Sequence, residues 1–226
     1  MATHATTKAI ERPLRRVPVQ GRSVARVARM LDACAELVDE VGCDGLTTTL
    51  LAERARVAIG SVYQFFPDKQ AVVRALVVRN LEEYLGRLET RLASAAFRHW
   101  WEAVDAAIDE YIEMHRNVPG FRTLRFGDIG DKPLTDNELD SATVIADQLV
   151  ALLADRLAAP DQAAPDQAVS DQAEPGRQEP RLALIVATEM SDALVTLAFR
   201  RDPAGDPQVL AECRALTKEY VTRQLP

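Results

Sequence analysis

Residues 47–69 read TTTLLAERARVAIGSVYQFFPDK, and this stretch decides the fold. Thr47 and Thr48 carry hydroxyl groups that can cap the N-terminus of a helix. They come just before apolar residues at helical spacing, namely Leu50, Leu51, Ala52 and Ala55. Arg56 and Val57 then interrupt this spacing. The stretch therefore predicts a short helix that ends in a tight turn.

A second short helix is expected over residues 59–66, and the following Pro-Asp-Lys would end it and open a longer helix. Its apolar members would point inward: Val62, Phe65 and Phe66. Its outer face would carry Gly60, Ser61, Tyr63 and Gln64. A small residue, a hydroxyl, a phenol and an amide suit a major groove, because these groups bond phosphates and base edges without a deep pocket. The alternative for Tyr63 is a half-buried aromatic that completes the small core.

The 226-residue chain has a formal net charge of −7, which by itself argues against a polyanion as partner. The charge is unevenly distributed, however. Residues 1–30 hold seven basic side chains against Glu11 alone, a net charge of +6, so the remainder carries −13. The basic residues are Lys8, Arg12, Arg15, Arg16, Arg22, Arg26 and Arg29. A basic segment on an acidic body is a local electrostatic footprint for double-stranded DNA.

Residues 1–22 are expected to form a flexible basic arm. The segment lacks hydrophobic periodicity and contains Pro13 and Pro18. Its cluster RPLRR could place arginines in a narrow minor groove, where the negative potential is enhanced. An ordinary solvated terminus is the alternative.

The helix-turn-helix pattern of residues 47–69 resembles that of the TetR family of transcriptional regulators. The resemblance implies that Thr47 and Thr48 meet a phosphate, as helix N-termini favour anions. It also implies a phosphate contact for Lys69, which opens the next helix. The full DNA-binding set that we expect is Arg15, Arg16, Arg22, Thr47, Thr48, Arg56, Ile59, Gly60, Ser61, Tyr63, Gln64 and Lys69.

The sequence departs from the family pattern at two positions. Arg56 stands where the family usually has glycine, because the turn favours a positive φ; a non-glycine residue there costs roughly 1 kcal/mol. Ala58 stands where a Ser or Thr cap is usual, and an alanine cap typically forfeits about 1 kcal/mol. Arg56 could recover its cost through a phosphate contact.

The rest of the chain is also expected to be helical, which makes the fold class all-α. Apolar residues recur at helical spacing over about 23–41, 69–96, 99–116, 135–159, 181–201 and 207–225. Residues 160–180 contain the repeats PDQA, PDQA and SDQA with four prolines, and are expected to form a disordered loop. We therefore expect a helix-turn-helix domain over 23–68 and a helical effector-binding and dimerisation domain over 69–226.

The two apolar helices at the C-terminal end suggest a four-helix bundle between two subunits of a homodimer, which is also where TetR-like proteins dimerise. An intrachain bundle is the alternative. Aromatic and methionine side chains of the body could line an apolar cavity. The resemblance implies that a small apolar or amphipathic effector binds there and releases a repressor from a palindromic operator. The candidate effector-binding residues are Tyr84, Trp101, Tyr111, Met114, His115, Phe121, Phe126 and Met190; the alternative is that they simply fill the core.

Enzyme activity, a cofactor and a metal site are not expected. His4, His99 and His115 lack metal-ligand spacing, and no nucleophile elbow or glycine-rich phosphate loop is present. The alternative function is a DNA-binding regulator that is independent of ligand or controlled by a protein partner.

The chain is expected to act in the cytoplasm and away from membranes. Cys34, Cys43 and Cys213 lack C-x-x-C spacing, which favours a reducing compartment without disulfides or structural zinc. We expect no apolar run that approaches the roughly 18–20 residues needed to span a bilayer. The first sixteen residues lack the apolar core of a secretory signal.

Overall fold

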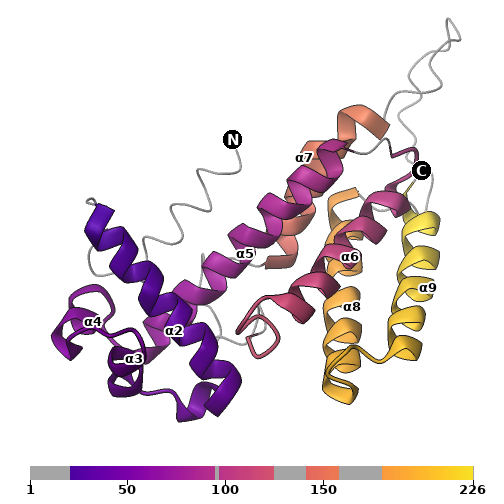
Figure 1. The fold of residues 1–226 in the computed structure, drawn as a ribbon. Helices are drawn as coiled ribbons and strands as arrows, with labels where there is room; N and C mark the ends of the chain where they lie inside the picture. Colours follow the sequence, from indigo (N-terminus) through magenta and orange to yellow (C-terminus); the bar gives the residue numbers. More distant parts are fainter. Residues whose placement is uncertain (1–20, 95–96, 125–140, 158–179, 226) are drawn as a thin grey trace, which may run out of the picture. The chain divides into compact units, whose positions relative to one another are not determined.

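A computed structural model describes residues 21–94, 97–124, 141–157 and 180–225 of the chain (Figure 1). Within these ranges all regular elements are helices, which confirms the expected all-α class. They are α2 (Gly21–Gly45), α3 (Thr48–Arg54), α4 (Ile59–Phe65), α5 (Lys69–Ser94), α6 (Trp100–Asn117), α7 (Ser141–Leu157), α8 (Pro180–Arg201) and α9 (Pro207–Gln224). The expected helix boundaries agree closely with these, except that the helix expected over 135–159 begins and ends outside the described residues. Residues 160–179 of the expected loop also lie outside them.

The chain divides into two compact units. The first comprises residues up to Tyr84 together with Met114–Asp140, and the second comprises Leu85–Glu113 together with Ser141–Pro226. The division falls within α5 and within α6, so each of these helices contributes to both units.

The first unit is built around α2, α3, α4 and the first half of α5 (Figure 1). One hydrophobic cluster joins these helices. Its fully buried large side chains include Met30, Leu51, Phe65, Phe66 and Leu76. Burial of these apolar side chains holds the short helices α3 and α4 in place, because helices of seven residues are not stable alone.

The buried face of α2 is wider around the helix than the apolar spacing predicts, and it covers a shorter length of the helix. Val27 and Leu31 are buried as expected, but Val24 is 50% exposed and Val41 is 46% exposed. Periodicity gives the direction of an apolar face and not how far along the helix its partners extend, which explains the error. The regular helix breaks at Gly42, whose φ of 71° is the left-handed conformation that glycine adopts without strain.

The second unit contains α7, α8 and α9, with α8 in contact with both of its neighbours (Figure 1). This explains why α8 is apolar around most of its circumference. Asp206 caps α9, since its Oδ1 accepts hydrogen bonds from the backbone N–H groups of Gln208 and Val209 at 3.0 and 3.3 Å. Pro207 follows at the first helical position, where its missing N–H costs nothing.

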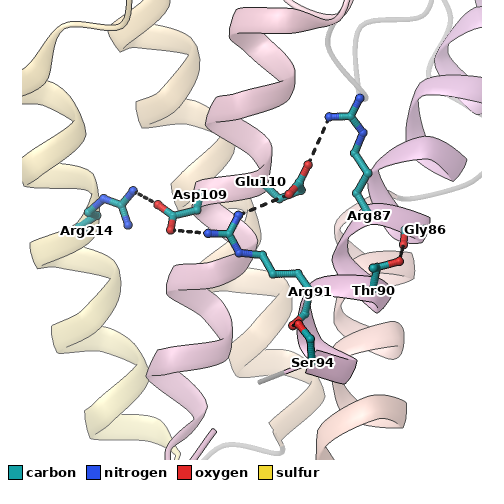
Figure 2. Close-up of polar contacts among 8 residues, drawn as sticks. All are labelled: Gly86, Arg87, Thr90, Arg91, Ser94, Asp109, Glu110 and Arg214. Carbon is teal, nitrogen blue, oxygen red and sulfur yellow. Dashed lines mark hydrogen bonds and ion pairs between the residues drawn. The ribbon is translucent and has the colours of Figure 1, made fainter. Parts of the chain in front are cut away.

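A network of ion pairs connects α5, α6 and α9 in the second unit (Figure 2). Arg214 of α9 pairs with Asp105 and Asp109 of α6. Asp109 also pairs with Arg91 of α5 at 2.9 Å. Glu110 accepts from Arg91 and Arg87, both at 3.4 Å. Each exposed pair contributes little by itself, but a network in which carboxylates are shared orients three helices together.

Helix α8 is the one helix in the described ranges that is long and apolar enough to cross a membrane, judged by length and composition. Its mean hydropathy reaches 1.7 over an 18-residue window, so the expectation that no run approaches this criterion was wrong. A single such helix is weak evidence for a membrane span, because the core helix of a soluble protein passes the same test. The contacts of α8 with α7 and α9 are those of a core helix.

Candidate nucleic-acid interface

The N-terminus of α3 is capped by Thr47, as expected from the sequence. Thr47 has an extended backbone, and its hydroxyl oxygen accepts a hydrogen bond from the N–H of Leu50 at 3.1 Å. The cap satisfies one of the donors that every helix leaves open at its start. Other N–H groups of the first turn, together with the helix dipole, favour an anion at this end.

Thr48 and Tyr63 connect the start of α3 to the outer face of α4. The hydroxyl oxygen of Thr48 lies 3.0 Å from the phenol oxygen of Tyr63, and either group can donate. Tyr63 is 45% exposed and is not among the residues of the hydrophobic cluster, which does not support the alternative that it completes the small core. The two groups expected to meet a phosphate therefore form one polar site.

The turn between α3 and α4 takes the conformation expected from the resemblance, although it lacks glycine. Arg56 has a φ of 54°, which is positive and left-handed. The N–H of Arg56 donates to the carbonyl of Glu53 at 3.1 Å, and that of Val57 donates to the carbonyl of Ala52 at 3.0 Å. This pair of bonds is the Schellman arrangement, which closes a helix through a left-handed residue. Arg56 is exposed and carries the conformational cost that a glycine would avoid.

Helix α4 starts without a side-chain cap, because Ala58 offers none. Its inner face consists of Val62 and Phe65, both buried, and Phe66 just beyond is buried too. The residues expected to read DNA lie outward or half outward: Ile59, Gly60, Tyr63 and Gln64 are exposed, and Ser61 is half-buried.

Gly60 has no neighbour that requires a glycine. A Cβ built on it meets no heavy atom within 4 Å, and its φ is not in the left-handed region. The fold therefore tolerates a side chain there. A glycine on an open helix face instead permits the close approach of another molecule.

Arg54 is a residue of α3 whose role the sequence reasoning missed. Its guanidinium donates to Glu40 at 2.7 and 2.8 Å and to Glu36 at 3.1 Å. These contacts tie α3 to α2, and the hydrogen bonds from Arg54 lower the pKa of Glu40. Arg54 stabilises the packing of α3 on α2, whereas Arg56 is exposed in the turn. Opposite charges 14 and 18 residues apart gave no signal in the sequence, because their meeting depends on how α2 and α3 pack.

Lys69 also has contacts within the unit. Its ammonium group donates to the backbone carbonyls of Cys43 and Asp44, both at 3.2 Å. These carbonyls lie just beyond the break of α2 at Gly42, so the contact joins the start of α5 to the segment that follows this break. Arg22 is exposed in the first turn of α2, whereas Arg15 and Arg16 lie outside the described residues.

The residues expected to bind an effector are divided between the two units. Tyr84, Met114, His115 and Phe121 belong to the first unit, where all four are buried. The rings of His115 and Phe121 stack edge to face with centroids 5.0 Å apart. Trp101, Tyr111 and Met190 belong to the second unit, and Phe126 lies outside the described residues.

In the second unit two of the three expected residues, Tyr111 and Trp101, contact polar or charged groups. The phenol of Tyr111 donates a hydrogen bond to Asp192 on α8. Lys218 of α9 places its ammonium 5.9 Å from the ring centroid of Trp101, within the range of a cation–π contact. No cluster of three or more potential metal ligands occurs among the residues that the structure describes.

Comparisons with known proteins identify the family. The model of bacterial regulatory proteins of the tetR family matches residues 30–76, which include α3 and α4, and the model of the tetracyclin repressor-like C-terminal domain matches residues 98–170. The crystal structure of a TetR-family transcriptional regulator from Streptomyces coelicolor is similar over 88% of this chain and 99% of that one, with 38% identity and a TM-score of 0.69. The chain belongs to the TetR family of transcriptional regulators. It is therefore a helix-turn-helix DNA-binding protein and not an enzyme.

Other similar proteins are more distant. The HTH-type transcriptional regulator BetI of Burkholderia mallei is 30% identical over 80 residues, which cover 35% of this chain and 41% of BetI. The matched stretch thus spans about two fifths of the curated relative. FadR from Bacillus subtilis, solved in complex with stearoyl-CoA, shares the fold with a TM-score of 0.57 and 18% identity over 86% of this chain and 97% of that one.

Proposed function

We propose that this regulator is a homodimeric repressor that binds a pseudo-palindromic operator and releases it when a small apolar or amphipathic effector binds. The outer face of α4 carries this proposal. Gly60, Tyr63 and Gln64 are exposed there, and Tyr63 is bonded to Thr48 at the N-terminus of α3. In this arrangement α4 enters the major groove while the start of α3 meets the phosphate strand.

The proposed DNA contacts differ in what they recognise. Thr47, Thr48, Arg56 and Lys69 contact phosphates and set the register, as helix ends and cations do. Ile59, Gly60, Ser61, Tyr63 and Gln64 face the bases and their backbone. Arg22, with Arg15 and Arg16 of the arm, adds a sequence-independent electrostatic contribution that salt weakens.

Dimerisation through α8 and α9 completes the interface. One helix of seven residues contacts too few bases for specificity, and two copies spaced about one DNA turn apart, roughly 34–36 Å, double the contacts. Leu182 on α8 and Leu216 on α9 support this surface, because both are large apolar side chains that are exposed in a single chain. We place the protein in the cytoplasm, with a helix-turn-helix domain over 23–68 and an effector-binding and dimerisation domain over 69–226.

Effector control is supported by four buried side chains of the first unit, namely Tyr84, Met114, His115 and Phe121. FadR of Bacillus subtilis, a member of the same fold, was solved with stearoyl-CoA, an amphipathic molecule. A regulator that acts without a ligand, or under a protein partner, is the second candidate.

Selection of bound fragments from the source genome tests the proposal. We expect enrichment of a pseudo-palindrome near the protein's own promoter, and loss of this enrichment in Tyr63→Ala/Gln64→Ala. Equal affinity for all duplexes at moderate salt would reject specific binding. An apolar compound that releases the enriched fragment supports effector control, whereas DNA binding that no compound alters favours the second candidate.

A further inference from the structure

Asn80 on α5 is a polar residue at a position that the helix otherwise fills with apolar side chains. Leu76 and Tyr84, one turn before and one turn after it on the same face, are both buried. Asn80 itself is only 1% exposed. Asparagine is also a weaker helix former than leucine, since its short amide competes for the backbone. A leucine at this position would satisfy both the burial and the helix better.

The amide of Asn80 has no hydrogen-bond partner. Its Oδ1 and its Nδ2 are both buried and unbonded. In the described part of the chain, the one other unbonded buried side-chain atom is Oε1 of Gln224. A buried donor and acceptor that stay unpaired carry their full desolvation penalty, and the large majority of buried side-chain polar atoms in native proteins are paired. The whole amide of Asn80 therefore points to a partner that the folded chain does not itself provide.

The surroundings of Asn80 indicate what that partner is. Asn80 belongs to the same compact unit as the buried Tyr84, Met114, His115 and Phe121. Apolar and aromatic walls with a few polar groups are typical of small-molecule sites. The buried polar side chains of the described residues are Asn80, His115, Gln148, Ser191 and Thr217, and none of these is a lysine, arginine or carboxylate. A charged ligand group would find no counter-charge among these fully buried side chains, and burying it unpaired would be unfavourable.

We propose that Asn80 is the hydrogen-bonding anchor of the effector site and that the effectors are neutral, largely apolar molecules with a carbonyl beside an N–H or O–H group. Small-ring lactams, whose amide is held cis, and α-hydroxyketones have this pattern. A primary amide offers one acceptor and two donors, so it pairs with such a group through two complementary bonds. The inference rests on the proposed effector control of DNA binding and names the chemical class of the effector.

Two leucine substitutions on α5 separate the anchor from a general effect of losing an amide. Asn80→Leu removes the buried amide, and Gln70→Leu removes an exposed one from the same helix. Full-length wild type and both variants are screened by thermal shift. The probes are ε-caprolactam and 3,4-dihydro-2(1H)-quinolinone, which carry a cis amide in a small ring, and their counterparts cycloheptanone and 2-tetralone, which carry only the carbonyl. Release of an operator fragment is measured for every compound that binds.

We expect Asn80→Leu to melt at a higher temperature than wild type without ligand, because an unpaired amide is replaced by an apolar side chain. An amide probe should raise the melting temperature of wild type and Gln70→Leu by about 2–4 °C, and bind Asn80→Leu about tenfold more weakly. The ketone counterparts can accept only one of the two bonds, so Asn80→Leu should weaken their binding less than it weakens binding of the amide probes.

Several results would overturn the inference. A lower melting temperature for ligand-free Asn80→Leu would mean that the amide is already satisfied in the folded protein, and so would a crystal structure with a water bonded to both its atoms. Compounds that bind and release DNA equally from wild type and Asn80→Leu would leave effector control standing but remove Asn80 from the site. A panel in which no compound shifts any of the proteins would count against both.

Discussion

The phenol oxygen of Tyr63 on α4 lies 3.0 Å from the hydroxyl oxygen of Thr48 in the first turn of α3. The bond joins the outer face of the proposed reading helix to the helix end that favours a phosphate. Both groups retain a lone pair or a proton for a further bond, since a hydroxyl can donate once and accept twice. Their contact therefore presents two hydroxyls to one strand in a fixed geometry.

Removal of the phenol hydroxyl is expected to weaken operator binding without unfolding the protein. Tyr63→Phe loses one hydrogen bond to DNA and the bond to Thr48, so affinity should fall about 3–10-fold. The free energy of unfolding should stay within about 0.5 kcal/mol, because the group is exposed. Fluorescence anisotropy on an operator fragment, with urea unfolding alongside, measures both.

Thr48→Val provides the second arm of a double-mutant cycle with Tyr63→Phe. If the two hydroxyls act as one site, the double variant binds more tightly than the sum of the single losses predicts. Strictly additive losses would show that each hydroxyl meets DNA alone.

Arg56 has a strained, positive φ at the turn and places a positive charge there. Arg56→Gly should raise the free energy of unfolding by about 1 kcal/mol, because φ is 54° there and glycine adopts that value freely. If the guanidinium meets a phosphate, the same variant binds DNA more weakly, and the slope of log affinity against log salt falls by about 1.

Arg56→Lys is the matched control, because it keeps both the strain and the charge. It should resemble wild type in melting temperature and in salt slope. An Arg56→Gly variant that melts higher but keeps the wild-type slope would assign Arg56 a role in the turn alone.

If Gly60 permits the close approach of DNA to α4, as proposed, a methyl group there should affect binding and not folding. Gly60→Ala adds a Cβ into open space and improves helix propensity, so the free energy of unfolding should rise by up to about 1 kcal/mol. Operator affinity should fall at the same time. Gly86→Ala on α5 is the matched control, since its Cβ also meets no atom within 4 Å. It should stabilise similarly and leave DNA binding unchanged; equal binding by both variants would remove Gly60 from the interface.

The pair of Arg54 with Glu40 should make stability depend on acid pH. Hydrogen bonds from Arg54 hold the pKa of Glu40 below its ordinary 4.5. A carboxyl whose folded pKa is depressed stabilises the fold above its unfolded pKa, and loses that contribution as pH falls through the folded pKa. Glu40→Gln should therefore unfold at lower urea than wild type at pH 7, and the difference should shrink below about pH 4.5.

Glu53→Gln on α3 serves as the control for this pH dependence, because Glu53 is an exposed carboxylate in the same unit. Its urea midpoint should follow that of wild type at pH 7 and at pH 3. A gap between Glu40→Gln and wild type that is as large at pH 3 as at pH 7 would contradict the assignment to an ion pair.

Local signals in the sequence were sufficient for the elements of the reading head and insufficient for its tertiary contacts. The cap at Thr47 depends on its own hydroxyl, so residue type predicted it. The positive φ at Arg56 and the missing cap at Ala58 were instead expected from the resemblance to the TetR family. The apolar set on α3 was partly wrong, because Leu50 is exposed. Periodicity cannot tell which members of an apolar stripe reach the core.

Contacts between distant residues gave no signal in the sequence. Thr48 and Tyr63 are 15 residues apart, and Asp39 bonds to Gly120 across 81 residues. Asn80 visibly interrupts the apolar stripe of its helix in the sequence. The sequence does not tell whether such an asparagine is exposed to solvent or buried. Its burial and its unpaired amide follow only from the packing of the whole unit.

The segment after α6 packs closely against α2. Asp39 holds it there through hydrogen bonds, and the lack of a side chain at Gly120 allows the close approach. The N–H of Gly120 donates to Oδ2 of Asp39 at 2.7 Å, and the hydroxyl of Thr123 donates to Oδ1 at 2.6 Å. Gly120 has a φ of 73°, and a Cβ there would lie 2.8 Å from Cα of Ala35. Gly120→Ala therefore suffers both backbone strain and a clash with a helix backbone that cannot yield. Its free energy of unfolding should fall by about 2–4 kcal/mol.

Asp39→Ala removes only the two hydrogen bonds and should cost about 1–3 kcal/mol, part of it from the N–H of Gly120 that is left without an acceptor. Urea unfolding of both variants, with Gly86→Ala as the glycine control, separates the steric from the polar contribution. Because the last turn of α6 and α2 belong to the same unit, both variants should also unfold locally more often, which faster hydrogen exchange at the amide of Gly120 would show. Gly120→Ala with wild-type stability would mean that this segment is not packed on α2 in solution.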